Sequence, residues 1–166
     1  MAAPLIQVRG AVQEDLPRIL AIYNREVLVS TATYDTVPRT PTEHRKWFSL
    51  HGPDYPVLVA EAGGIVEGWA SLSPWSDRAA YARASEVSVY VAEEHRRKGV
   101  GRLLLGSLIE AGRTYGYRAL LARISADNEA SVHLHAELGF IVVGTLKEVG
   151  MKFGMTLDVC IMELLV

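Results

Sequence analysis

The sequence has little cysteine, no long apolar run and no large excess of charge of either sign. Its single cysteine, Cys160, excludes an intrachain disulfide and any metal site built from several cysteines. The 17 lysines and arginines stand against 19 acidic residues, and a net charge of -2 gives no global field for nucleic acid or an anionic membrane. Any basic site must therefore be local.

Other absences narrow the class of protein further. No apolar stretch approaches the roughly 18 residues of a membrane span, and residues 1–10 lack the charged start and apolar run of a signal peptide. We therefore expect a cytoplasmic protein with no membrane or nucleic-acid partner. With 49% hydrophobic and 22% charged residues and no low-complexity segment, the composition excludes disorder. The length of 166 residues fits a single domain over residues 1–166.

The first third of the chain predicts a strand and two helices. Short alternation predicts an edge strand at residues 6–11. Pro17 lies in the first turn of a helix whose apolar stripe consists of Leu16, Ile19, Leu20, Tyr23 and Val27. Residues 30–41 predict a polar loop that can reach a site, and Thr42 is the expected N-cap of a short second helix.

The rest of the chain alternates strands with helices. Gly63-Gly64 between apolar runs at residues 55–62 and 65–72 predicts a hairpin. The later elements are a strand at 84–91, a helix from a glycine turn to Gly116, a strand at 119–124, a helix at 128–138, and strands at 140–144 and 155–164. This order predicts an α/β (mixed α+β) domain with one twisted mixed sheet of about six to seven strands and helices on both faces.

A glycine turn between a strand and a helix is the first candidate site. Arg96, Gly99 and Gly101 form R-x-x-G-x-G, in which glycine lets a ligand approach the backbone, and free amides with the helix dipole attract phosphate. Further positive charge comes from Arg97, Lys98 and Arg102. The turn lacks the G-K-[ST] of a Walker loop, and Leu104 stands where the dinucleotide fingerprint needs a small residue. The turn is either a pyrophosphate site or a solvated basic cluster. The motif alone does not decide between them, but the surrounding elements favour the pyrophosphate site.

Those surroundings resemble the GNAT superfamily of N-acetyltransferases over nearly the whole chain. The resemblance rests on the glycine turn and on N-x-x-S-x-x-L-H-x-x-L-G-F at residues 128–140. The motifs P-W-x-x-R-x-x-Y at 74–81 and E-V-S-V-Y-V at 86–91, with F-G at 153–154 and L-D at 157–158, resemble the phosphinothricin and methionine sulfoximine acetyltransferase branch. The resemblance implies acetyl-CoA as co-substrate and no metal.

For the co-substrate, the resemblance implies an extended pairing and a phosphate cradle. The pantetheine amides would pair like an extra strand with Val89, Tyr90 and Val91, which requires the neighbouring strands to splay. The implied cradle and helix contacts are Arg96, Arg97, Lys98, Gly99, Val100, Gly101, Arg102, Asn128 and Ser131. His135 shares a helix face with Asn128 and Ser131 and stands where many members carry the tyrosine that protonates the leaving thiolate. The structural alternative is an Asn128 N-cap with Ser131 and His135 facing solvent.

For the acceptor, Glu86 is the candidate general base, relaying a proton through water, and a paired surface carboxylate is the alternative. A backbone amide at Tyr90 or Val91 would meet the oxyanion. Arg78 supplies a guanidinium fork for a carboxylate. The expected acceptor contacts are Trp75, Arg78, Tyr81, Glu86, Val87 and Ser88, and a packing role in the core is the alternative for Trp75.

The expected function is acetyl transfer from acetyl-CoA to the α-amine of a small amino-acid analogue, of phosphinothricin, methionine sulfoximine or methionine sulfone type, by direct attack in a ternary complex. Acetylation of a protein N-terminus or another small amine, and a non-catalytic acyl-CoA-binding sensor, are the alternatives. Cys160 lies in an apolar strand without an adjacent histidine and is expected to be a buried bystander. The resemblance also implies a homodimer in which a last loop, residues 147–154, completes the acceptor site.

Overall fold

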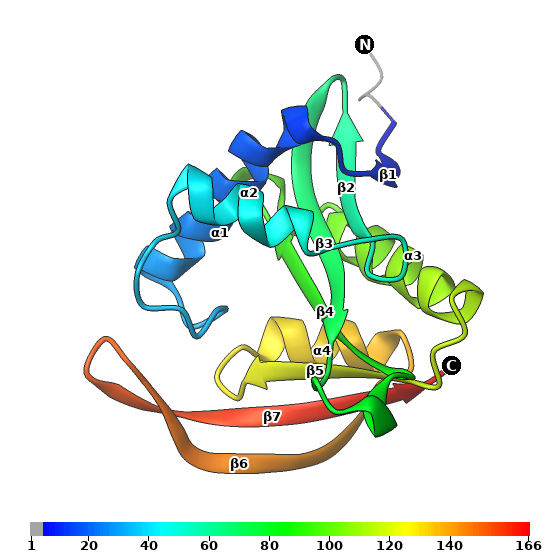
Figure 1. Ribbon diagram of the computed structural model, residues 1–166. Coiled ribbons are helices and arrows are strands. Elements are labelled where there is room, and N and C mark those ends of the chain that lie inside the picture. Colours follow the sequence, from blue (N-terminus) through cyan, green and yellow to red (C-terminus); the bar gives the residue numbers. More distant parts are fainter. Residues whose placement is uncertain (1–4) are drawn as a thin grey trace.

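The computed structural model describes residues 5–166 (Figure 1). The expectation that residues 1–10 form no signal peptide therefore falls partly outside the described residues. Seven strands form one sheet in the order β1-β2-β3-β4-β5-β7-β6. The strands are β1 Gln7–Gly10, β2 Val57–Ala62, β3 Ile65–Pro74, β4 Ala84–Val91, β5 Ala119–Ser125, β6 Ile141–Lys152 and β7 Met155–Leu165. The helices are α1 Leu16–Val29, α2 Pro41–Ser49, α3 Val100–Thr114 and α4 Glu129–Glu137. None of the helices in residues 5–166 has the length and apolarity that crossing a bilayer demands.

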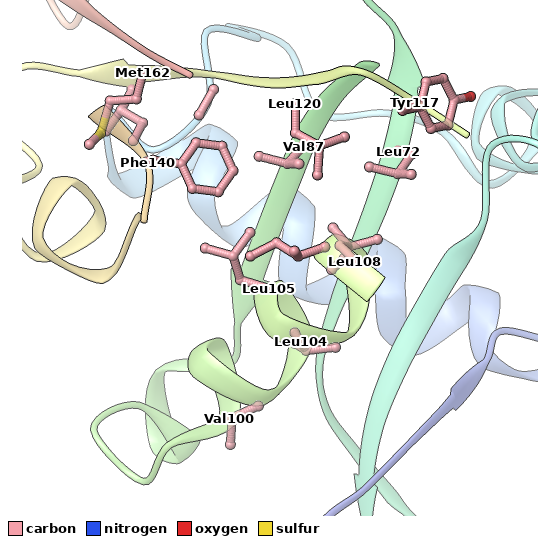
Figure 2. Close-up of a cluster of buried hydrophobic side chains, with 14 of the residues drawn as sticks. Leu72, Val87, Val100, Leu104, Leu105, Leu108, Tyr117, Leu120, Phe140 and Met162 are labelled. Carbon is pink, nitrogen blue, oxygen red and sulfur yellow. The ribbon is translucent and has the colours of Figure 1, made fainter. Parts of the chain in front are cut away.

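Helices cover both faces of the sheet, as predicted. Trp69 and Ala70 are neighbours on β3, yet they belong to different hydrophobic clusters. Trp69 packs with buried residues of α1, and Ala70 packs with buried residues of α3. Successive residues of a strand point to opposite faces, and β3 is therefore a nearly continuous buried run rather than an alternating one. The α3 side holds the larger cluster, in which Leu104, Leu105 and Leu108 pack on the sheet (Figure 2).

The sheet divides into two halves at its only parallel pair in the described chain, β4 with β5. These strands pair at Ala84–Ala119, Ser85–Leu120 and Glu86–Leu121 and then separate. Beyond that point β4 remains paired with β3 as far as Val91, and β5 remains paired with β7 as far as Ser125. In Figure 1, β3 and β4 run across the direction of β5 and β7. The splay that the resemblance requires is present.

The expected N-cap at Thr42 is wrong, because the second helix begins two residues earlier. The hydroxyl of Thr40 accepts a hydrogen bond from the Glu43 N–H (3.3 Å), and the Glu43 carboxylate accepts one from the Thr40 N–H (2.7 Å). Pro41 occupies the first helical turn, where its missing N–H costs no hydrogen bond. The T-x-x-E spacing was the available signal for this capping box.

The expected strand at residues 140–144 is also wrong in extent. Strand β6 continues to Lys152 against β7, and the segment 147–154 is the far end of a long hairpin rather than a loop. Phe153 and Gly154 form its turn, with φ angles of 52° and 72°. Irregular pairing between Leu146 and Gly150, with Glu148 at φ 54°, breaks the alternation that would have identified the strand.

Candidate active site

Two adjoining hollows occupy the split between β4 and β5. A cleft of about 780 Å³ runs from the glycine turn along β4 and α4, and a smaller cavity of about 110 Å³ lies near the point where the strands part. The residues that line both are Ala32, Val89, Tyr90, Asn128 and Ser131. Glu86, Arg123 and His135 also line the smaller cavity. The split thus joins the long cleft to the smaller cavity, which we call the end chamber.

The sheet register decides which backbone groups of β4 face this split. The Ala92 N–H donates to the Glu67 carbonyl (2.9 Å), and the β3–β4 register continues without a bulge. In an antiparallel pair the bonded residues alternate, so the backbone groups of Tyr90 and Ser88 point toward β3. Those of Val89 and Val91 point into the split. Of the two amides expected to meet the oxyanion, that of Val91 therefore faces the split and that of Tyr90 does not, although Val91 lines only the larger cleft.

The glycine turn exposes backbone donors at the mouth of the cleft. Gly99 is the N-cap of α3 at φ 85°, and it offers no side chain to the first free N–H groups of the helix. A Cβ on Gly101 would lie 3.2 Å from Leu134 of α4 and 3.6 Å from Val91. Gly101 therefore permits the close approach of α3, α4 and β4, while Gly99 permits the left-handed turn. Donors without partners at a helix N-terminus suit an anion.

The basic residues of the turn differ in how freely they can meet a ligand. Arg96 pairs with the buried carboxylate of Glu26 (2.5 Å) and donates to the Val91 carbonyl (3.1 Å), which ties α1 to the end of β4. Arg97 and Arg102 line the cleft, and Arg102 reaches Glu137 (3.0 Å). Lys98 and Val100 do not line it: Lys98 donates to the Glu94 carbonyl, and the Val100 side chain is in the core.

The start of α4 combines the two alternatives considered for it. Asn128 caps the helix by accepting a hydrogen bond from the Ser131 N–H (3.2 Å), and both residues also line the cleft. His135 is buried rather than facing solvent. Its Nδ1 lies 2.8 Å from the Ser131 carbonyl, which can only accept, so Nδ1 carries the proton.

That arrangement opposes the expected role of His135 as an acid. Burial lowers the pKa of the imidazole below its ordinary value. In the neutral ring Nδ1 holds the proton, and Nε2 can therefore accept a proton but not donate one. The geometry makes His135 a support for the first turns of α4, where it also meets the Phe140 ring edge-on at 5.1 Å between centroids.

Glu86 is a paired carboxylate, as its alternative interpretation expected, but the sequence did not identify the partner. The guanidinium of Arg123 on β5 donates through Nε (2.7 Å) and Nη2 to the two carboxylate oxygens of Glu86. The Arg123 guanidinium carbon also lies 5.2 Å from the centre of the Trp75 ring. A lone arginine within an otherwise apolar strand was the available signal. Glu86 and Arg123 line the smaller cavity, whereas Trp75 does not line it and contacts the pair only through the Arg123 guanidinium.

Arg78 and Tyr81 are not brought into this cavity. Arg78 precedes the short turn Ala79–Tyr81 between β3 and β4, and Tyr81 ends it. Both are exposed, and neither is among the residues that line the two hollows. Val87 and Ser88 do line the smaller cavity. Cys160 is buried as expected, and burial raises the pKa of its thiol.

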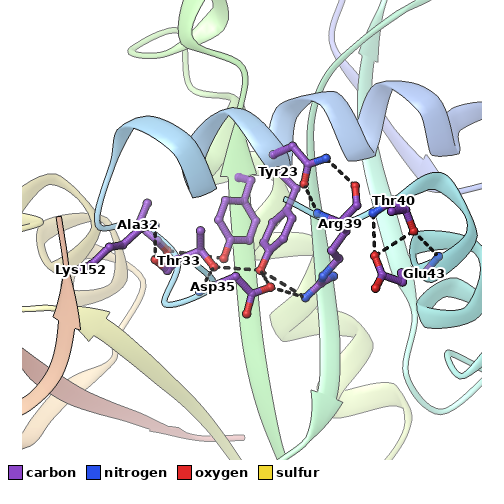
Figure 3. A network of polar contacts seen from close by, with 10 residues as sticks. Tyr23, Ala32, Thr33, Asp35, Arg39, Thr40, Glu43 and Lys152 are labelled. Atoms are coloured by element: carbon purple, nitrogen blue, oxygen red, sulfur yellow. Dashed lines mark hydrogen bonds and ion pairs between the residues drawn. The ribbon is translucent and has the colours of Figure 1, made fainter. Parts of the chain in front are cut away.

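The polar loop after α1 closes one side of the smaller cavity, in agreement with its expected reach. Ala32, Thr33 and Tyr34 line the cavity. The loop is held by a hydrogen bond of 2.9 Å between the hydroxyls of Tyr23 and Thr33, and by the buried Lys152 of β6, whose Nζ donates to the Thr33 carbonyl (2.8 Å) (Figure 3). The tip of the β6–β7 hairpin therefore positions this wall of the cavity.

Comparison with known proteins agrees with this geometry. Residues 18–140 match the model of the acetyltransferase (GNAT) family. An L-methionine sulfoximine/L-methionine sulfone acetyltransferase of Pseudomonas paraeruginosa is 41% identical, over 95% of this chain and 92% of the relative.

Two solved structures are also similar. A GNAT superfamily phosphinothricin acetyltransferase from Sinorhizobium meliloti, in complex with AcCoA, has a TM-score of 0.94 at 36% identity, over 97% of this chain and 88% of the other. A ribosomal-protein-alanine N-acetyltransferase from Brucella melitensis has a TM-score of 0.94 at 41% identity, over 96% and 99%.

The assignment for His135 can be tested by nuclear magnetic resonance of its ring nitrogens. We expect a titration midpoint below the ordinary 6.5, with the neutral ring protonated on Nδ1. Because the folded state then binds this proton less readily than the unfolded state, the wild type should lose stability relative to His135→Gln as the pH falls through about 6.5. A midpoint above that of the denatured protein, or a proton on Nε2, would restore His135 as a candidate acid.

Proposed function

This chain belongs to the acetyltransferase (GNAT) family, and on that premise we propose that it transfers an acetyl group from acetyl-CoA to the α-amine of a small amino-acid analogue. The acceptors are of the phosphinothricin, methionine sulfoximine or methionine sulfone type. The observation that carries the proposal is the split between β4 and β5, because it brings an open backbone edge, a glycine turn with free N–H donors and a carboxylate to two adjoining hollows.

The residues along the cleft fit acetyl-CoA. Its volume of about 780 Å³ is in the usual range for small-molecule sites. Val89 and Val91 would pair with the amides of the pantetheine arm, while the free N–H groups at the start of α3, with Arg97 and Arg102, would hold the pyrophosphate. Bound there, acetyl-CoA supplies an activated thioester carbonyl to the end chamber.

Within that chamber Glu86 binds the acceptor's ammonium and accepts its proton, directly or through a water molecule. The amine nitrogen then forms a bond to the acetyl carbon as the carbon–sulfur bond breaks, and the electron pair of that bond leaves with sulfur. The nitrogen gives up its second proton, which ends on the thiolate of CoA. Negative charge that develops on the carbonyl oxygen would face the open N–H edge of β4 in this chamber. Cys160 takes no part, because its thiol is buried and its pKa is raised by that burial. The unpaired thiol suits the cytoplasm, which we propose as the location.

One comparison favours a second candidate function, acetylation of a protein N-terminus. The Brucella melitensis structure named for a ribosomal-protein substrate is 41% identical to this chain. A peptide acceptor needs an open groove beside the base, whereas the chamber at Glu86 measures about 110 Å³ and is walled by the loop after α1. The small chamber favours a free amino acid.

An acetylation assay with methionine sulfone and matched N-terminal peptides tests the function. Wild-type protein should acetylate the free amino acid, and Glu86→Gln should lower kcat by about 100-fold or more near neutral pH. Cys160→Ala is the control, and its kcat should equal that of the wild type. Peptides acetylated in preference to the amino acid would support the second candidate, and an unchanged kcat in Glu86→Gln would remove Glu86 from the chemistry.

We also propose that the chain forms a homodimer through β6. This strand is a sheet edge that carries an unusual density of exposed apolar side chains, namely Ile141, Val142, Val143, Leu146, Val149 and Met151. Monomeric proteins rarely leave such an apolar band in water, and an edge strand invites pairing with a second chain. A second copy would bury the band symmetrically. The hairpin tip, residues 152–155, lies within reach of the acceptor chamber through Lys152.

Light scattering coupled to size-exclusion chromatography tests the dimer. Wild-type protein at micromolar concentration should have twice the mass of the chain, and Val143→Glu with Met151→Glu should give monomers because buried charges oppose association. Leu50→Glu, at an equally exposed apolar position after α2, should remain dimeric. A monomeric wild type, or dimers that survive the β6 changes, would contradict this interface.

A further inference from the structure

Arg123 lines the end chamber with guanidinium N–H donors that do not bond to Glu86. A guanidinium has five N–H donors, and Glu86 takes one from Nε and one from Nη2. Three donors remain, one on Nη2 and two on Nη1. They form the end-on fork that binds a carboxylate in two parallel hydrogen bonds. This fork is available without breaking the pair with Glu86.

The surroundings hold that fork in place. The Glu86 side chain is 17% exposed, and that of Arg123 is 48% exposed. Glu86 is therefore the more enclosed member of the pair, and Arg123 remains accessible to a ligand. Trp75 lies under the guanidinium at 5.2 Å. Both members of the pair line the smaller cavity, together with Tyr34 from the loop after α1. A surface ion pair without such support would hold neither partner in one orientation.

We propose that Arg123 is the residue that selects acceptors with a free α-carboxylate. The carboxylate binds the Nη1/Nη2 edge of Arg123, and the α-ammonium of the same molecule binds Glu86. An amino acid carries these two charges on one carbon, and the Glu86–Arg123 pair presents the complementary charges side by side. The inference deepens the proposed function and rests on it.

This assignment replaces the fork that the sequence suggested at Arg78. Arg78 is exposed and does not line the chamber. Carboxylate binding by Arg123 also gives a physical reason why the enzyme would choose free amino acids over protein N-termini. The first residue of a peptide has an amide where the amino acid has its carboxylate. That amide has no negative charge for Arg123 and leaves the fork without a partner.

Calorimetry with L-methionine sulfone and its carboxamide, on protein saturated with CoA, tests the proposal. Wild-type protein should prefer the acid, and Arg123→Gln should weaken acid binding by about 10- to 100-fold while carboxamide binding changes little. Arg123→Lys keeps the charge but not the fork and should recover part of the loss. Arg118→Gln, at an exposed arginine just before β5, is the matched control and should retain the preference.

The outcomes separate this proposal from the proposed function. Equal losses for acid and carboxamide in Arg123→Gln would reduce Arg123 to a structural partner of Glu86 and overturn the proposal. So would a preference that disappears in Arg78→Gln but survives in Arg123→Gln. A wild type that acetylates acid and carboxamide equally keeps the function and overturns this inference. A wild type that binds the acid through Arg123 without acetylating it supports this inference and removes the function.

Discussion

The early end of pairing between β4 and β5 is the constraint on which the site depends. After Glu86 and Leu121 the two strands follow different partners, β3 and β7, and cannot satisfy each other's backbone groups. A strand edge inside a protein needs hydrogen-bond partners, and a ligand with peptide-like amides can provide them. Gly101 allows α3 to approach Leu134 of α4 and Val91 of β4 closely, so the packing of these elements maintains the opening.

Charge around the split is organised by ion pairs that orient each cation. Glu26, buried in α1, holds Arg96 at the end of β4, and Glu86 holds Arg123 at the other end of the hollow. Groups oriented in this way need little reorganisation when a charged ligand arrives, which is the main advantage of a folded site over free solution. The buried Lys152 extends the same principle to the loop after α1, because it links that loop to the β6–β7 hairpin.

The sequence predicts features whose signals are local, and it fails where distant segments decide. The double-glycine hairpin, β4 and the glycine turn before α3 carry their signals within a few residues, and all three are found at the expected places. The extent of β6 depends on pairing with β7 across a bulge, and the proton position on His135 depends on the Ser131 carbonyl. The Glu86–Arg123 pair joins residues on two strands whose register no local pattern reveals.

Amide hydrogen exchange along β4, with and without CoA, tests the central claim that the open edge of this strand binds the co-substrate. The N–H groups of Val89 and Val91 should exchange more slowly by roughly an order of magnitude or more when CoA is present, because each gains a hydrogen bond. Those of Ser88 and Tyr90, already directed to β3, should be slow in both states. Unchanged exchange at Val89 and Val91 in CoA-saturated protein would contradict the account.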